Sequence, residues 1–196
     1  MRAGRIWTVL ISAGLGLVLF LPLIAAVGSP LLAYRQPVYI AAGLAGVLGL
    51  MLLALQPLLA VGALPGISIL RGRRWHRLAG GALVLAVVAH VAGLWITSPP
   101  DVIDVLLLRS PTPFSIWGVM AMWAVFASAA LALWRHRLRL AVWRVVHRGL
   151  ALVITAGTAV HAALIEGTME PLTKGALCIL AVGATLAAMA ARNSAR

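Results

Sequence analysis

The sequence contains few acidic residues, one cysteine and no long polar segment. Its 196 residues include four Asp or Glu against sixteen Lys or Arg, which gives a formal net charge of +12. The single cysteine, Cys178, excludes an internal disulfide and a metal site built from several cysteines. No polar segment is long enough for a nucleic-acid-binding fold, so we expect no nucleic acid among the partners despite the positive charge. A glycine-rich nucleotide-binding loop is also absent.

Apolar residues, in contrast, make up 63% of the chain, and the mean hydropathy is +1.05. They form six runs, each long enough to cross a hydrocarbon core about 30 Å thick as an α-helix. The sequence therefore predicts an all-α integral membrane protein, a single domain over residues 1–196 in which six transmembrane helices form a bundle. The expected helices cover approximately residues 6–27, 38–62, 76–97, 114–134, 140–164 and 172–191.

Two of these runs contain features that bear on this interpretation. The first follows Arg2 and Arg5 and ends in small residues, as a signal peptide does, but it is too long for the apolar core of one. We therefore expect it to remain as a transmembrane helix. Pro57 lies inside the second run, which it should kink or end early.

The basic residues indicate how the helices are oriented. In a six-helix arrangement thirteen arginines fall on one side of the membrane, and only Arg35, Arg109 and Lys174 fall on the other, together with all four acidic residues. Cytoplasmic loops carry an excess of Lys and Arg, so this distribution places both termini in the cytoplasm. We expect a bacterial inner (plasma) membrane protein. The thirteen residues are Arg2, Arg5, Arg71, Arg73, Arg74, Arg77, Arg135, Arg137, Arg139, Arg144, Arg148, Arg192 and Arg196.

Four of the five histidines fall into two equal intervals within the third and fifth runs. His76 and His90 are fourteen residues apart, and so are His147 and His161. Fourteen residues of α-helix are close to four whole turns and about 21 Å of rise, so each helix presents both imidazoles on one face, near the two sides of the hydrocarbon core. Ionisable side chains at this depth are candidates for function.

The third and fifth runs are separated by one helix, so they cross the membrane in the same direction. His76 and His147 should share the cytoplasmic level, while His90 and His161 share the outer level. Two helices of a bundle can present one imidazole each to a cofactor between them. The sequence therefore predicts two haems stacked across the membrane between the third and fifth helices, with these four histidines as axial ligands of the haem iron.

Residues around the histidines suit this cofactor. Gly80 and Gly157 lie four residues from a histidine on the same helical face, where a missing side chain would leave room for the macrocycle. Haem propionates require cationic partners, and guanidinium groups fit carboxylates well. At the cytoplasmic level we expect these partners among Arg73, Arg74, Arg77, Arg144 and Arg148.

Other interpretations of these residues exist. Histidines near a membrane interface often have only a packing role, although apolar neighbours make this a poor account of His90 and His161. A transporter that relays protons or binds a metal ion through histidines would use acidic residues within the membrane, but all four carboxylates lie in loops. A purely structural anchor leaves the histidines unexplained. An aromatic belt at the interfaces accounts for Trp7, Trp75, Trp95, Trp117, Trp134 and Trp143.

At these residues the sequence resembles the ferric reductase-like transmembrane domain, the six-helix dihaem module of ferric reductases and NADPH oxidases. The resemblance rests on H-x13-H from His76 to His90 and from His147 to His161, on R-R-W-H-R and W-R-V-V-H-R, and on the six runs. It implies two non-covalent haems b, the first bound by His76 and His147 and the second by His90 and His161. We find no further duplication of the fold beyond the histidine spacing and the adjacent Arg and Gly residues.

The resemblance also implies a function, transmembrane electron transfer by an oxidoreductase component. Reductases of this family commonly continue into a cytoplasmic flavin and nicotinamide domain, whereas this chain stops at Arg196, so we expect no flavin or nicotinamide site in it. The partners would be membrane lipid, a separate cytoplasmic flavoprotein or quinol as donor, and an outer acceptor such as a ferric chelate or a periplasmic redox protein. The alternative is similarity to the haem-binding membrane subunit of the periplasmic methionine sulfoxide reductase system.

Overall fold

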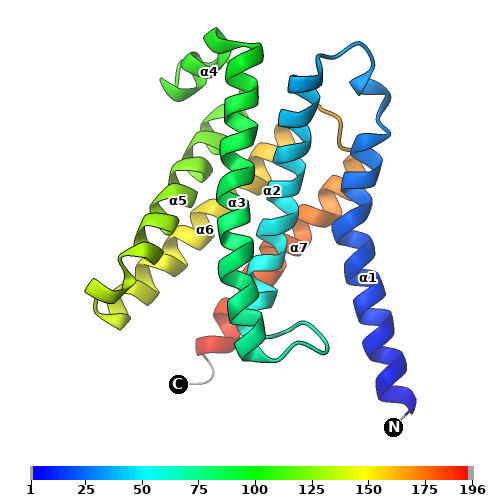
Figure 1. Ribbon diagram of the computed structural model, residues 1–196, viewed down its shortest axis with the longest axis vertical. Coiled ribbons are helices and arrows are strands. Elements are labelled where there is room, and N and C mark those ends of the chain that lie inside the picture. The colour runs from blue at the N-terminus through cyan, green and yellow to red at the C-terminus, as the bar shows by residue number, and fades with distance from the viewer. Residues whose placement is uncertain (1, 194–196) are drawn as a thin grey trace.

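The computed structural model describes residues 2–193, and the side chains of residues 5–191. This part of the chain is all-helical, with seven α-helices and two short 3-10 helices, η1 and η2 (Figure 1). Six of the α-helices are long and apolar enough to cross a membrane, as predicted. The elements are α1 (Arg2–Val27), η1 (Pro30–Leu32), α2 (Pro37–Val61), α3 (Ile69–Thr97), α4 (Pro99–Leu106), α5 (Ser115–Leu133), η2 (Arg135–Arg137), α6 (Leu140–Leu164) and α7 (Pro171–Asn193).

Some details differ from the expectation. Helix α3 begins at Ile69 rather than at His76, because Ser68 caps it: the Ser68 hydroxyl oxygen accepts a hydrogen bond from the backbone N–H of Arg71 (3.4 Å). The basic residues before His76 therefore lie on the first turns of the helix and not in a loop. Helix α2 continues through Pro57 to Val61, so the expectation of an early end is wrong. The short helix α4 was not expected.

Helices α2 and α3 form a close hairpin because glycines stand at their contacts. Gly62 ends α2 in the left-handed conformation (φ 72°), which a residue with a side chain rarely adopts. A Cβ atom on Gly72 would lie 2.7 Å from the carbonyl oxygen of Leu59, closer than any side chain allows. The two helices can approach each other this closely only because both positions lack side chains.

The last two helices are joined by polar contacts at their ends. The side-chain oxygens of Glu170 accept hydrogen bonds from the backbone N–H groups of Thr173 (2.7 Å) and Leu172 (2.8 Å) at the start of α7. Lys174 donates from Nζ to the carbonyl oxygen of Ile165 (2.7 Å), just after the end of α6. Both contacts satisfy backbone groups that the helix ends leave unpaired.

The interior is small and α2 lies at its centre. One buried cluster joins α1, α2 and α7 through residues such as Leu19, Leu50 and Leu177, and a second joins α2, α3, α5 and α6 through residues such as Leu83 and Ile154. In the most apolar window of α2, 39% of the residues are buried, against 17% in α1, α3, α6 and α7. Most apolar side chains of these helices therefore face outward, as expected of a protein surrounded by lipid.

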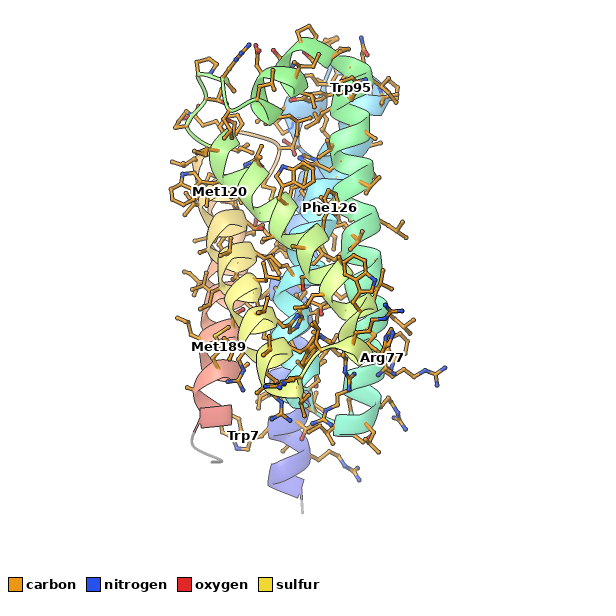
Figure 2. The ribbon with its side chains drawn as sticks, turned by 90° about the vertical axis from the view of Figure 1, so that its left-hand side faces the viewer. Trp7, Arg77, Trp95, Met120, Phe126 and Met189 are labelled. Atoms are coloured by element: carbon orange, nitrogen blue, oxygen red, sulfur yellow. The ribbon has the colours of Figure 1, made fainter. Side chains whose placement is uncertain are left out.

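The charged residues divide between the two ends of the bundle. Helices α3 and α6 both begin at the end of the bundle where α1 begins and α7 ends, which we call the arginine-rich end, and they run in the same direction (Figure 1). Arg77 and Trp7 lie toward this end and Trp95 toward the opposite one (Figure 2). Asp101 lies on α4 at the opposite end, while the Arg196 position and the Arg2 and Arg192 side chains fall outside the described residues.

Candidate functional site

The structure brings His76 of α3 and His147 of α6 together, and we call them the inner pair. Their ring centroids are 6.3 Å apart and the rings are nearly perpendicular, at 86°. Two imidazoles that bind one transition-metal ion from opposite sides, through bonds of about 2.0–2.1 Å, have ring centroids roughly 6 Å apart. The inner pair thus has the spacing that a single metal atom between two axial imidazoles requires.

His76 is held by α2. Its Nδ1 lies 3.1 Å from the backbone carbonyl oxygen of Gln56, to which it can donate. The side-chain amide of Gln56 also faces the ring: with its nitrogen turned toward the histidine, that nitrogen lies 2.6 Å from Nδ1. In this orientation the nitrogen also reaches the backbone carbonyl oxygen of His76 (3.2 Å) and the amide oxygen accepts from the Gly80 N–H (2.9 Å), so Nδ1 is an acceptor and the ring proton lies on Nε2. The opposite orientation, with the amide oxygen toward the ring, goes with a proton on Nδ1 and an unprotonated Nε2. The orientation of this amide therefore decides which ring nitrogen can bind a metal.

His147 is held by α5 and by its own helix. Its Nδ1 lies 3.2 Å from the hydroxyl oxygen of Ser128. One turn earlier on α6, Trp143 stacks on the imidazole with ring centroids 5.1 Å apart and an interplanar angle of 9°. The guanidinium of Arg135 lies 5.3 Å from the centre of the Trp143 ring, so the three side chains form a continuous stack, which we call the Trp143 stack.

His90 and His161, the outer pair, occupy the other level of the same two helices. The Nδ1 of His90 lies 2.8 Å from the backbone carbonyl oxygen of Ala42 on α2. The Nδ1 of His161 lies 2.9 Å from the carbonyl oxygen of Phe114, at the start of α5. A carbonyl can only accept, so both rings carry their proton on Nδ1, and Nε2 is left as the nitrogen whose lone pair could bind a metal. Imidazoles that bind metals are commonly oriented in this way.

A glycine makes each of these outer contacts possible. A helical carbonyl already accepts from the N–H four residues later, which is Gly118 for Phe114 (3.2 Å) and Gly46 for Ala42. A Cβ atom on Gly118 would lie 2.6 Å from His161 Nδ1, and one on Gly46 would lie 3.0 Å from His90 Nδ1. At Gly118 a side chain would force the imidazole away from its carbonyl, and at Gly46 a side chain would require the ring to shift by a few tenths of an ångström. Neither glycine is among the site residues expected from the sequence.

These contacts repeat along the chain at a constant interval. The residues that hold the histidines are 72 residues apart, from Ala42 to Phe114, from Gly46 to Gly118 and from Gln56 to Ser128. The histidines themselves are 71 residues apart, from 76 to 147 and from 90 to 161. The expectation that the internal similarity ends at the histidines and their adjacent Arg and Gly residues is therefore wrong, because it extends to the helices α2 and α5 that hold them.

The other predicted site residues lie around the pairs. A Cβ atom on Gly80 would lie 3.9 Å from the Gln56 side chain, and one on Gly157 would lie 3.0 Å from the carbonyl oxygen of Trp117. The missing side chains at these glycines thus let α2 pack against α3 and α5 pack against α6. Contact of either glycine with a haem remains a prediction. Arg73, Arg74, Arg77 and Arg144 are exposed and Arg148 is half-buried, all at the arginine-rich end.

The possible metal ligands in the structure limit the kind of metal centre that the two histidine pairs could form. Within the described residues no group of three or more His, Cys, Asp or Glu side chains could hold a metal ion. A bare ion in a protein requires three or four such ligands. Two opposed imidazoles suffice when a macrocycle supplies the remaining donors, as in a haem with two axial histidines. The pairs therefore suit haem and do not suit a bare metal ion.

Comparison with known proteins identifies the family. Residues 43–158, more than half of the chain, match the family described as ferric reductase like transmembrane component. The chain belongs to this family. The match spans α2 to α6 and contains His76, His90 and His147, while His161 lies just beyond it. No curated protein and no solved structure matches the sequence.

Membership of the ferric reductase-like family gives the histidine pairs a biochemical context. The family implies oxidoreductase-type activity and transmembrane electron transfer. In this ferric reductase-like chain the six apolar helices are those of an integral membrane protein. The two pairs lie at different levels of α3 and α6, which is the arrangement that a path through the membrane requires.

Proposed function

We propose that this protein carries electrons across the membrane through two bis-histidine haems b, from a donor on the cytoplasmic side to an acceptor on the outer side. The observation that supports this most strongly is the inner pair, whose rings are 6.3 Å apart, as two axial ligands of one iron would be. A haem iron with two axial imidazoles accepts and releases one electron at a time. The acceptor we propose is ferric iron in a chelate or a periplasmic redox protein.

The protein residues would fix the ligands and set their basicity. Backbone carbonyls hold the Nδ1 protons of His90 and His161, which keeps each Nε2 directed away from the neighbouring helix. The Ser128 hydroxyl lies against Nδ1 of His147, and the backbone carbonyl of Gln56 lies against Nδ1 of His76, where each would hold a ring proton in the same way. Arg74, Arg77, Arg144 and Arg148 lie close to the inner pair in sequence and would neutralise haem propionates.

The direction of transfer depends on which end is cytoplasmic. We infer that the arginine-rich end faces the cytoplasm, because positive charge is retained on that side. Reporter domains fused after Arg137 and after Arg196 should both give cytoplasmic signals. A periplasmic signal at either position reverses the assignment of donor and acceptor sides.

Histidine substitutions test the pairing. Extraction of non-covalent haem should give about two haems per chain, and His90→Ala should remove mainly one of them. Adding His161→Ala should cause little further loss, since the two ligands act as a unit, whereas adding His147→Ala should remove the second haem. His136→Ala is the matched control, because His136 lies in η2 outside both pairs.

Two outcomes would contradict the proposal. A protein that stays haem-free under haem-replete expression excludes the cofactor. Non-additivity between His90 and His147, instead of between His90 and His161, contradicts the arrangement of the ligands.

A further inference from the structure

The surface of the arginine-rich end carries a density of positive charge that no acidic residue of the protein offsets. The sequence has no Asp or Glu before Asp101 or between Asp104 and Glu166, so both loops at this end lack carboxylates entirely. Eight arginines at the start of α3, in η2 and around the start of α6 are exposed, and Arg148 is half-buried. We call the exposed ones the arginine surface: Arg71, Arg73, Arg74, Arg77, Arg135, Arg137, Arg139 and Arg144.

Topology alone does not explain how this surface is connected to the interior. Arg135 lies over the ring of Trp143, and Trp143 lies flat on the imidazole of His147. The Trp143 stack thus runs from an exposed guanidinium to a member of the inner pair. An interfacial tryptophan usually turns its indole N–H toward water or headgroups, but Nε1 of Trp143 is buried without a hydrogen-bond partner. The stacking on His147 therefore determines the position of this side chain, and an aromatic belt does not.

We propose that the arginine surface docks an acidic, soluble one-electron donor protein and that the Trp143 stack is where its electron reaches the inner pair. This inference rests on the proposed function, because it requires a haem between His76 and His147. In the step, the donor loses one electron and the ferric iron of the inner haem becomes ferrous. No bond is formed or broken and no proton is transferred. The outer pair has no comparable surface, since the carboxylates lie at its end.

Charge complementarity determines the class of partner. A surface of one sign attracts a partner of the opposite sign and raises its association rate by about 10- to 1,000-fold, an effect that salt removes. Anionic lipid headgroups could also pair with these arginines. They would not, however, use an aromatic contact that reaches a redox ligand, so the Trp143 stack favours a protein donor.

The test measures how fast the inner haem is reduced. The full chain, loaded with haem, is placed in nanodiscs of neutral phosphatidylcholine and mixed with a reduced, strongly acidic flavodoxin, and absorbance reports the reduction. Photoreduced riboflavin, a small reductant without a protein surface to dock, is the parallel donor. We expect the rate constant with flavodoxin to fall by about one to three orders of magnitude from low to high salt, and the rate with riboflavin to stay constant.

Matched variants locate the effect. Arg135→Gln and Arg137→Gln should each lower the flavodoxin rate at low salt and flatten its salt dependence. Arg5→Gln removes one exposed charge at the same end, on α1, and should leave the rate unchanged. Trp143→Leu should slow reduction by flavodoxin more than reduction by riboflavin. Trp134→Leu, which removes an exposed tryptophan at the end of α5, should slow neither.

The outcomes separate this inference from the proposed function. If riboflavin reduces the haem but flavodoxin is slow and insensitive to salt, or if Arg135→Gln and Arg5→Gln behave alike, the docking surface is refuted while the proposed function stands. A flavodoxin rate that depends on anionic lipid in the nanodisc, and not on Arg135, assigns the arginines to the membrane. If neither reductant reduces a bound haem, the proposed function fails and the inference fails with it.

Discussion

The substitution Gly118→Ala tests whether the outer pair depends on the glycine beneath it. The added Cβ would lie 2.6 Å from Nδ1 and 2.7 Å from Cε1 of His161, distances that real side-chain carbons do not reach. The ring would have to move away, and its 2.9 Å hydrogen bond to Phe114 would lengthen or break. The substitution should therefore disturb the orientation of His161 without removing its imidazole.

The size of the effect follows from the overlap. Inserting a methyl group into a packed contact costs about 1–3 kcal/mol. Each 1.4 kcal/mol is a factor of ten in an equilibrium constant, so haem should bind the outer site roughly 5- to 150-fold more weakly. Gly46→Ala should have a smaller effect of the same kind, because its Cβ would lie 3.0 Å from the His90 ring.

The haem affinity of the outer site is measured by titrating the apoprotein with haem, and redox titration distinguishes the two sites. Gly149→Ala is the neutral control on α6, since nothing lies within 4 Å of its added Cβ. Gly72→Ala controls for overpacking in general: its Cβ would meet the Leu59 carbonyl between α2 and α3, so it should lower thermal stability and leave the outer site intact. Wild-type haem affinity at the outer site of Gly118→Ala would refute the reasoning.

Three further predictions follow from other contacts. Ser128→Ala removes the hydroxyl beside His147 and should shift the potential of the inner haem alone, by roughly 20–60 mV if the contact is worth about 0.5–1.5 kcal/mol, in a redox titration with Ser128→Thr as control. Lys174→Ala removes the hydrogen bond to the Ile165 carbonyl and should lower the free energy of unfolding by about 1 kcal/mol. The absorbance spectra of haem bound at the inner and outer pairs should stay unchanged. The backbone N–H groups of Thr173 and Leu172 hold the pKa of Glu170 below its usual range, so the stability it contributes is present above the usual glutamate pKa and is lost as the pH falls through the lowered one. Melting temperatures measured from pH 6 to pH 3 should therefore fall less steeply in Glu170→Ala, and a parallel fall would contradict this.

The histidine spacing was enough to predict which residues meet at the inner pair. Helical geometry relates His76 to His90 without any tertiary information, and the single intervening helix fixes that α3 and α6 run in the same direction. The apolar runs likewise predicted six candidate spans, which the structure contains. These predictions succeed because they depend on distances within one helix and on the count of membrane crossings.

The residues that hold the histidines could not be predicted in the same way. Gly46 and Gly118 are two of nineteen glycines, and nothing in their neighbourhood marks them until the helix that packs on each is known. A comparison at an interval of 72 residues aligns Gly46 with Gly118, but it aligns Gln56 with Ser128, so the shared role of the two helices shows only in their contacts. The sequence pattern placed Trp143 in the aromatic belt at the membrane interface. Its stacking on His147 depends on side-chain orientation, which the sequence does not give.

The division of each pair between α3 and α6 determines when the sites can form during synthesis. Domains and segments are completed in order from the N-terminus. When α3 has been made, His76 and His90 already have their partners on α2, yet each lacks the opposing imidazole. That imidazole is supplied only by α6, the penultimate α-helix, whose His161 stands three residues before its end at Leu164. If haem binds as proposed, both sites could be loaded only after α6 has been made, and a chain truncated before α6 would carry four membrane-spanning helices and one histidine of each pair.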